Sequence, residues 1–261
     1  MSQLKVALIQ SDLHWQSADA NLAQFEEKIW QIEGKPDLIV LPEMFTTGFT
    51  MEPQGLGEPV NGKSYKWMKQ QAAQTKSVVL GSVIINEGGN FYNRLLVAFP
   101  DGKVLHYDKK HLFTLAGEDK EFSSGGIRLV FEWKGWKIMP LICYDLRFPV
   151  WSRSRSESIT YEYDMLIYCA NWPKPRVQAW DKLLAARAIE NQSFALGVNR
   201  VGVDGYGKEY SGHSAAYDFF GNQMAFSEKE EILEVALSKE ELEKYRERFP
   251  FQKDADHFSM T

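Results

Sequence analysis

Short apolar runs alternate with longer amphipathic segments along the chain, and this rhythm predicts stacked layers of sheet and helix. Runs rich in Val, Ile and Leu are typical of buried strands, and they occupy residues 4–10, 37–45, 77–83, 94–100, 103–109, 135–145, 163–171 and 194–202. Apolar residues at helical spacing predict helices at residues 19–30, 64–73 and 178–192. The pattern therefore predicts an α/β fold.

Turn and capping residues refine this prediction near the end of the chain. Two short motifs favour hairpin turns, Asp101-Gly102 and Gly221-Asn222. The second is expected to join a strand near residues 213–219 to one near 232–237. Ser238, followed by two glutamates, is typical of the start of a helix, and Pro250 marks its limit.

Composition narrows the class of protein. The 261 residues, 44% of them hydrophobic, are enough to bury a large core, and without internal repeats or linkers they are expected to form one domain, 1–261. The formal net charge of -5 is spread along the chain, which argues against a nucleic-acid surface. The expected partner is a small molecule.

The N-terminal residues and the cysteines indicate a cellular location. The chain begins with an apolar strand and lacks the basic start of a signal peptide, and no apolar run approaches the roughly 18 residues of a membrane span. The two cysteines, Cys143 and Cys169, form neither a disulfide framework nor a CxxC pair. A cytoplasmic protein with reduced thiols and no membrane association is expected.

Three apolar strands end in polar or turn-forming residues. Glu43, Cys143 and the segment 169–173 ("CANWP") each lie at such an end, where ligands bind in α/β architectures. Glu43 alone could also cap a turn or pair with a lysine. A free cysteine is often a buried small hydrophobe, an interpretation that suits Cys169; the polar residues that follow Cys143 favour a functional role for it.

A charged segment at residues 107–122 supplies further candidates. Lys109 and Lys110 precede an apolar patch, and an acidic cluster follows that contains Glu118, Asp119 and Glu121. By charge pattern alone this segment could be a solvated loop.

Together the three motifs carry a family resemblance. "LPEMF", "YDKKHLF" and "ICYDLRFP" resemble the carbon-nitrogen hydrolase (nitrilase) superfamily, and most closely its omega-amidase branch, which hydrolyses the terminal amide of 2-oxo acid amides such as 2-oxoglutaramate. The likeness covers nearly the whole chain. It implies a four-layer α-β-β-α sandwich with two mixed sheets flanked by helices, no cofactor, and a homodimer in which residues 238–261 contribute to the interface.

The resemblance also implies catalytic roles. Glu43, Lys109 and Cys143 match the family's required glutamate, lysine and cysteine, with Lys109 placed by its Lys-x-His motif. The second glutamate of the family falls at Glu118, and Glu121 is a weaker candidate. Cys143 is the expected nucleophile and Glu43 the general base, while Glu118 holds Lys109 in position.

Oxyanion and substrate contacts complete the expected site. Lys109 and the backbone N–H of Tyr144 would stabilise the negative oxygen of a tetrahedral intermediate. Four residues are expected to contact the substrate, namely Tyr144, Trp172, Lys174 and Arg176. Arg147 is expected to form a structural ion pair with Asp145.

Alternative interpretations remain open at this point. A papain-like Cys-His pair using His111 or His213 lacks a Cys-His signature near Cys143, and no HxH or HExxH spacing suggests a metal site. Another member of the superfamily, acting on a nitrile, an N-carbamoyl amino acid or a different amide, would share the same catalytic residues. A non-catalytic binding member is the remaining alternative.

Overall fold

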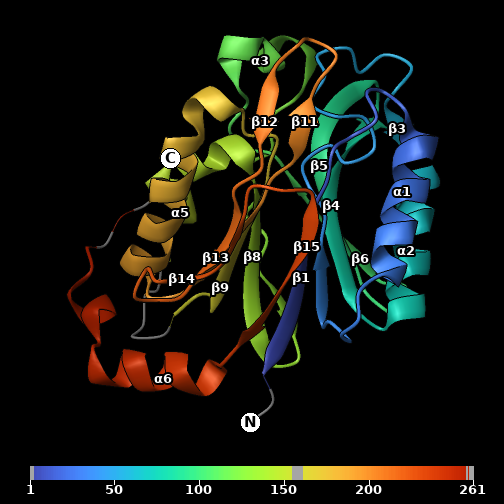
Figure 1. Ribbon diagram of the computed structural model, residues 1–261. Coiled ribbons are helices and arrows are strands. Elements are labelled where there is room, and N and C mark those ends of the chain that lie inside the picture. The colour runs from blue at the N-terminus through green and yellow to red at the C-terminus, as the bar shows by residue number, and fades with distance from the viewer. Residues whose placement is uncertain (1–2, 155–160, 257, 259–261) are drawn as a thin grey trace.

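The computed structural model describes residues 3–154, 161–256 and 258 of the chain. The chain forms two large sheets that stack face to face, with helices on both outer faces (Figure 1). Each sheet contains both parallel and antiparallel pairs. The predicted α/β class and the four-layer α-β-β-α sandwich are confirmed.

The first sheet has seven strands within the described residues, and its parallel strands are central. Its order is β15 (Glu231–Leu237), β1 (Leu4–Gln10), β2 (Leu38–Val40), β4 (Val78–Glu87), β5 (Asn90–Ala98) and β6 (Val104–Asp108), with β3 (Glu58–Pro59) beside β4. The strands β1, β2 and β4 run parallel, so their carboxyl ends share one edge of the sheet.

The second sheet has six strands in the same part of the chain. Its order is β14 (Gln223–Ser227), β13 (Ser214–Tyr217), β10 (Phe194–Val198), β9 (Met165–Cys169), β8 (Trp136–Ile142) and β7 (Phe131–Trp133). Here β8, β9 and β10 run parallel. A separate hairpin joins β11 (Val201–Val203) to β12 (Glu209–Ser211).

Four longer helices confirm the predicted helical segments. They are α1 (Ala18–Trp30), α2 (Lys63–Thr75), α5 (Val177–Asn191) and α6 (Lys239–Arg248). Ser238 caps α6, since its side chain accepts a hydrogen bond of 3.3 Å from the backbone N–H of Glu241. Shorter turns of helix lie in the loops, namely η1 (Thr114–Ala116), α3 (Glu118–Glu121), η2 (Cys143–Arg147), α4 (Pro149–Ser152), η3 (Lys174–Arg176) and η4 (Phe251–Asp254).

The period-2 alternation of strand residues distributes side chains between two apolar layers. Val6 and Leu8 of β1 belong to the core between the sheets, whereas Ile9 packs with Phe25 in the layer beneath α1 and α2. On the far side, α5 covers β10 so closely that a Cβ at Gly197 would lie 2.5 Å from the ring of Trp180. Glycine at this position therefore lets α5 seat Trp180, which is fully buried.

The structure corrects three predicted boundaries. The turn at Gly221-Asn222 joins β13 to β14, and β15 crosses to the first sheet to pair with β1. This crossing is held by Gln10, whose side-chain amide donates to the carbonyls of Ser227, the last residue of β14, and Lys229. The predicted strand 37–45 ends at β2, because the chain then turns through a positive φ of 42° at Met44. The predicted strand 194–202 is divided between β10 and β11.

Candidate active site

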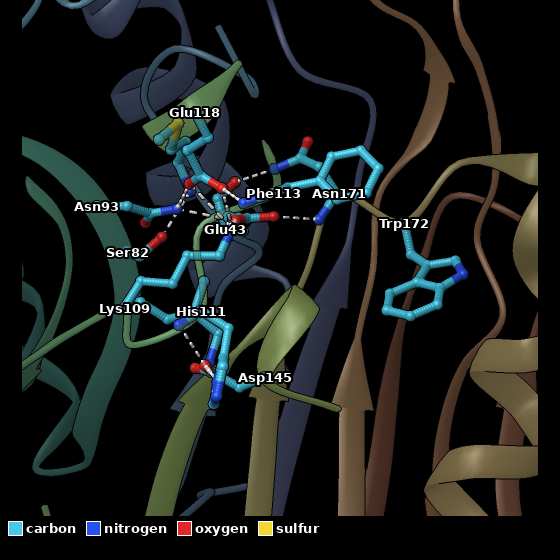
Figure 2. Close-up of polar contacts among 12 residues, drawn as sticks. Glu43, Ser82, Asn93, Lys109, His111, Phe113, Glu118, Asp145, Asn171 and Trp172 are labelled. Carbon is cyan, nitrogen blue, oxygen red and sulfur yellow. Dashed lines mark hydrogen bonds and ion pairs between the residues drawn. The ribbon is translucent and has the colours of Figure 1, made fainter. Parts of the chain in front are cut away.

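Three charged side chains from separate segments meet inside the protein, near the carboxyl ends of β2, β8 and β9 (Figure 2). Lys109 Nζ lies 2.8 Å from Glu43 Oε1 and 2.9 Å from both carboxylate oxygens of Glu118. Both glutamates are fully buried, and Lys109 is 1% exposed. A cation placed between two carboxylates meets the usual condition for burying charge, which is direct pairing.

The surroundings of Lys109 fix its protonation state. Burial alone would lower the pKa of Lys109, but the charges of Glu118 and Glu43 outweigh burial, and the pKa lies well above its ordinary value. Burial raises the pKa of Glu118, and the charge of Lys109 opposes that rise. At neutral pH Lys109 is therefore a fixed cation that can donate to an oxyanion and cannot act as a base.

Glu43 is held at both carboxylate oxygens. Besides Lys109, Oε1 accepts a hydrogen bond of 2.8 Å from Asn93 Nδ2, and Oε2 accepts one of 2.9 Å from the backbone N–H of Asn171. Asn93 Nδ2 also lies 3.3 Å from Glu118 Oε1. Asn93, on β5, therefore bridges the two glutamates, and Asn171, just after β9, joins the second sheet to Glu43.

Cys143 lies directly after β8, as the first residue of η2. Its φ of 40° is unusual for a residue other than glycine, and such strained positions persist only where surrounding contacts hold them. Asp145 supplies those contacts: Oδ2 accepts from the backbone N–H of Ile142 at 3.1 Å and from the Tyr107 hydroxyl at 2.8 Å. His111 donates its backbone N–H to Oδ1 at 3.0 Å and places Nδ1 2.8 Å from the same oxygen.

The thiol of Cys143 keeps its proton in the resting protein. Burial raises its pKa well above the ordinary value, the negative charge of Glu43 raises it further, and the charge of Lys109 opposes both. Glu43 lies beside the thiol, so it is the nearest group able to receive the proton when the sulfur attacks.

A cavity of about 420 Å³, including space open to solvent, adjoins the thiol. Aromatic side chains form a large part of its wall, namely Phe49, Phe113, Tyr144, Trp172 and Tyr210. Five predicted site residues line it, namely Lys109, Cys143, Tyr144, Trp172 and Arg176. The structure therefore brings the expected nucleophile, the expected oxyanion-stabilising cation and three of the four predicted substrate contacts to one cavity.

Arg147 also lines this cavity. The prediction that it forms an ion pair with Asp145 is wrong. Asp145 is already engaged by Tyr107, His111 and Ile142. The guanidinium of Arg147 instead lies over the ring of Trp172, 4.8 Å from its centroid, and has no ion pair with any residue that the structure describes. A cation in an aromatic cavity is thereby left available to an anionic ligand.

Two other predicted residues lie outside the cavity. Lys174 is on the surface, where Nζ is 2.7 Å from Glu209 Oε2. Glu121 accepts a hydrogen bond of 3.1 Å from Gln54, whereas Glu118 contacts Lys109.

The two histidines of the papain-like alternative also lie outside the cavity wall. The ring of His111 stacks on Phe148 at 3.8 Å and contacts Asp145, as described above. His213 Nδ1 lies 3.0 Å from Asp181. Neither imidazole is therefore placed to accept the proton of Cys143.

Comparison with known proteins decides the family. Residues 5–247 match the carbon-nitrogen hydrolase family. The chain is a carbon-nitrogen hydrolase. The resemblance read from the three sequence motifs is thereby confirmed, and the hydrolase is an enzyme that cleaves amide-type carbon-nitrogen bonds.

Named relatives match the hydrolase along its full length. It is 45% identical to the omega-amidase YafV of Yersinia enterocolitica, with 100% of both chains covered. It is 33% identical to the 2-oxoglutaramate amidase of Bacillus subtilis, over 94% of this chain and 95% of that one. A crystal structure of a CN-hydrolase superfamily protein from Xanthomonas campestris, with an arsenic adduct in its active site, superposes with a TM-score of 0.97 at 39% identity and covers 100% of both chains.

The arrangement in the hydrolase suits acyl transfer through a thiol. It provides a nucleophile, a carboxylate that can relay a proton, and a cation that can stabilise negative charge. These groups come from both sheets, because Glu43 and Lys109 follow strands of the first sheet and Cys143 follows a strand of the second.

Sequence reasoning missed the two asparagines that hold Glu43. Asn171 lies within the segment 169–173, which the sequence marked as a strand end without giving Asn171 a role. Asn93 stands directly before the apolar run 94–100 and was not singled out. A buried amide beside a long apolar run is the signal that could have identified Asn93, since such a group requires partners.

Two general searches of the described residues complete the picture. Among residues 3–154, 161–256 and 258, no helix has both the length and the apolar character needed to cross a membrane. The same residues contain no group of three or more His, Cys, Asp or Glu side chains placed to hold a metal ion.

Proposed function

We propose that the hydrolase is an omega-amidase, which converts the terminal amide of a short 2-oxo acid amide such as 2-oxoglutaramate into the acid and ammonia. The observation that carries this proposal is the buried Lys109, held between Glu43 and Glu118 beside the thiol of Cys143. The relatives named omega-amidase and 2-oxoglutaramate amidase support the substrate class.

The first half-reaction forms a thioester. Glu43 accepts the proton of Cys143 as the sulfur attacks the amide carbon, and the carbonyl oxygen becomes an oxyanion. Lys109 Nζ and the backbone N–H of Tyr144 stabilise that oxygen, and donors of this kind are worth roughly 3–4 kcal/mol each. Glu43 then delivers the proton to the nitrogen, the carbon-nitrogen bond breaks, and ammonia leaves.

The second half-reaction hydrolyses the thioester. Glu43 accepts a proton from a water molecule, whose oxygen attacks the thioester carbon. The same two donors stabilise the second oxyanion. When the carbon-sulfur bond breaks, Glu43 returns the proton to the Cys143 thiolate, and the carboxylic acid product is released. Glu118 keeps Lys109 charged and in place throughout.

The far end of the substrate meets the cationic part of the cavity. Arg147 and Arg176 both line the cavity. Trp172 contacts each of them. The ring of Trp172 lies under the guanidinium of Arg147, and Trp172 Nε1 donates to the backbone carbonyl of Arg176 at 2.8 Å. Arginine binds carboxylates through two parallel hydrogen bonds. These two side chains are therefore our candidates for binding the distal carboxylate, while Trp172 packs on the carbon chain.

A trapped acyl-enzyme tests the proposal. The protein is mixed with 2-oxoglutaramate, quenched in acid and measured by intact mass. We expect an acyl adduct on the wild-type protein and on Cys169→Ala, whose thiol is fully buried and outside the cavity, and none on Cys143→Ala. Ammonia release from a panel that includes a nitrile and an N-carbamoyl amino acid gives the specificity. Faster release from either of those compounds, or an adduct on Cys143→Ala, would contradict the proposal.

We further propose that the protein is a cytoplasmic homodimer of single-domain subunits. Both thiols are free, as suits a reducing compartment. A surface that we call the C-terminal aromatic patch provides apolar material for the interface; it comprises Ile189, Phe220, Tyr245, Phe249 and Phe251. In this patch Ile189, Phe220 and Phe251 are each more than half exposed. The partner is then a second copy of the chain, and nucleic acid is not expected to bind.

A further inference from the structure

A second and wider hollow lies outside the catalytic cavity. This vestibule has a volume of about 860 Å³, including space open to solvent. Four residues line both the cavity and the vestibule, namely Phe113, Pro173, Arg176 and Lys208. We call these four residues, which lie at the boundary between the vestibule and the cavity beside Cys143, the throat. Of the four, Lys208 has no role in the sequence prediction or in the chemistry described above.

Lys208 is carried to the throat by the β11–β12 hairpin, which stands at the same end of the molecule as α3 (Figure 1). The backbone N–H of Lys208 donates to Asp204 Oδ1 at 2.9 Å, and the Lys208 carbonyl accepts from the backbone N–H of Asp204 at 3.0 Å. The turn is therefore fixed by main-chain atoms of residue 208. Its side chain can change without removing these bonds.

No acidic side chain among the residues that the structure describes pairs with Lys208. The vestibule is lined by three cations and one carboxylate, and that carboxylate, Glu209, pairs with Lys174. Within the described part of the chain Lys208 makes no ion pair, and its Nζ lies over the ring of Tyr206 at 5.5 Å from the centroid. Its neighbour in the throat, Arg176, lies over the ring of Phe113 at 5.1 Å.

We propose that Lys208 is a specificity-determining residue that favours amides with a carboxylate at their far end. The inference rests on the proposed function and adds a residue and a region to it. The protein as a whole carries a formal charge of -5, so a cationic throat provides local attraction for an anion that the rest of the surface repels. Such attraction acts on the encounter rate and weakens as salt screens it.

The experiment compares two substrates that differ only in the group at the far end of the chain. Glutaramate, the monoamide of glutaric acid, and pentanamide have the same carbon chain, and only glutaramate carries a carboxylate. For Lys208→Met we expect kcat/KM for glutaramate to fall about three- to tenfold, as expected for loss of steering, with little change for pentanamide. Lys208→Arg keeps the charge and should retain the wild-type ratio. Added salt should reduce the wild-type preference and leave that of Lys208→Met nearly unchanged.

The double variant Lys174→Met/Glu209→Gln is the matched control. Lys174 is also an exposed lysine that lines the vestibule, but it lies outside the throat and is neutralised by Glu209, so removing both members of the pair leaves the net charge unchanged. We expect this double variant to keep the wild-type ratio of the two substrates. Equal effects of Lys208→Met on both substrates, or an equal effect of the double variant on glutaramate, would overturn the inference while leaving the proposed function intact. Failure of the proposed function would instead appear in the wild-type protein, as absence of ammonia release from both 2-oxoglutaramate and glutaramate, and the inference would fall with it.

Discussion

The side-chain amide of Asn93 holds the carboxylates of Glu43 and Glu118 in position around Lys109. Asn93 Nδ2 donates to Glu43 Oε1 and to Glu118 Oε1, and Asn93 Oδ1 has no hydrogen-bond partner among the described residues. Both donated bonds favour the ionised form of a carboxyl group. Asn93 is therefore a positioning residue, which acts on catalysis through the two glutamates.

We expect Asn93→Leu to lower kcat by about ten- to a hundredfold, because positioned proton transfer contributes on this scale. Its pH profile should also change. Burial already raises the pKa of Glu118, and loss of a donor to the ionised form raises that pKa further. Activity that needs ionised Glu118 is then lost at a higher pH as the solution is acidified. The acidic limb of kcat/KM should therefore move to higher pH.

The charged and titratable groups near these carboxylates include Lys109 and Cys143, and the charge of Glu43 also reaches Cys169 and Tyr210. The profile of Asn93→Leu is compared with those of the wild-type protein and of Asn93→Gln, in which a longer amide can still donate. A fall in kcat with an unmoved acidic limb would show that Asn93 serves only packing.

At the scale of elements, the η2 turn depends on contacts that are remote in sequence. Asp145 lies two residues after Cys143, but its partner Tyr107 belongs to β6 and its partner His111 lies just after that strand. For this reason a sequence pattern could not assign them. The nearest basic residue in sequence, Arg147, was the natural candidate partner of Asp145, and it lies in the cavity.

We expect Asp145→Asn to lower the free energy of unfolding by about 1–3 kcal/mol and to reduce kcat. Asparagine replaces one acceptor oxygen with an NH2 group, which is a donor. That donor would face groups that also donate, so buried hydrogen bonds would be left unmade. Urea denaturation and steady-state kinetics measure the two effects. Asp181→Asn, which alters the partly buried contact of Asp181 with His213 outside the cavity, serves as the control and should change both values little. Equal behaviour of the two variants would contradict a supporting role for Asp145 in the turn at Cys143.

The sequence predicted best those elements whose residues are buried on both faces. Strands such as β8 and β9 are continuous apolar runs because they lie between two layers, and their positions were recognised from the sequence. Short edge strands such as β7 and β12 leave no such run. The error at Gly221-Asn222 has a different cause: apolar periodicity identifies a strand, but it does not say to which sheet the strand belongs.

At the scale of the whole molecule, the C-terminal aromatic patch is where a second subunit is expected. The aromatic rings of this patch contact one another in turn. The ring of Phe220, between β13 and β14, lies 4.5 Å from that of Tyr245 in α6, and the ring of Tyr245 lies 5.4 Å from that of Phe249. Exposed aromatic groups in contact with one another are typical of protein interfaces. In Figure 1 this side of the molecule lies opposite α1 and α2.

Replacement of Phe220 tests this expectation. Phe220→Asp would place a charge in the proposed apolar interface. By analytical ultracentrifugation at micromolar concentration we expect the wild-type protein to be a dimer and Phe220→Asp to be a monomer. Trp30→Asp is the control, because Trp30 is 70% exposed at the end of α1, away from the patch. If Trp30→Asp is a monomer, or if Phe220→Asp dimerises as tightly as the wild-type protein, the interface does not lie at this patch.

The division of the catalytic groups between the two sheets bears on how the protein folds. Neither sheet alone holds all of the proposed catalytic groups. Glu43 and Lys109 follow strands of the first sheet, and Cys143 follows a strand of the second. A folding intermediate with only one sheet formed, or with both formed but not yet docked, therefore has no turnover. During refolding from denaturant, recovery of ammonia release marks the moment when the two halves dock, and it does so independently of any spectroscopic signal from secondary structure.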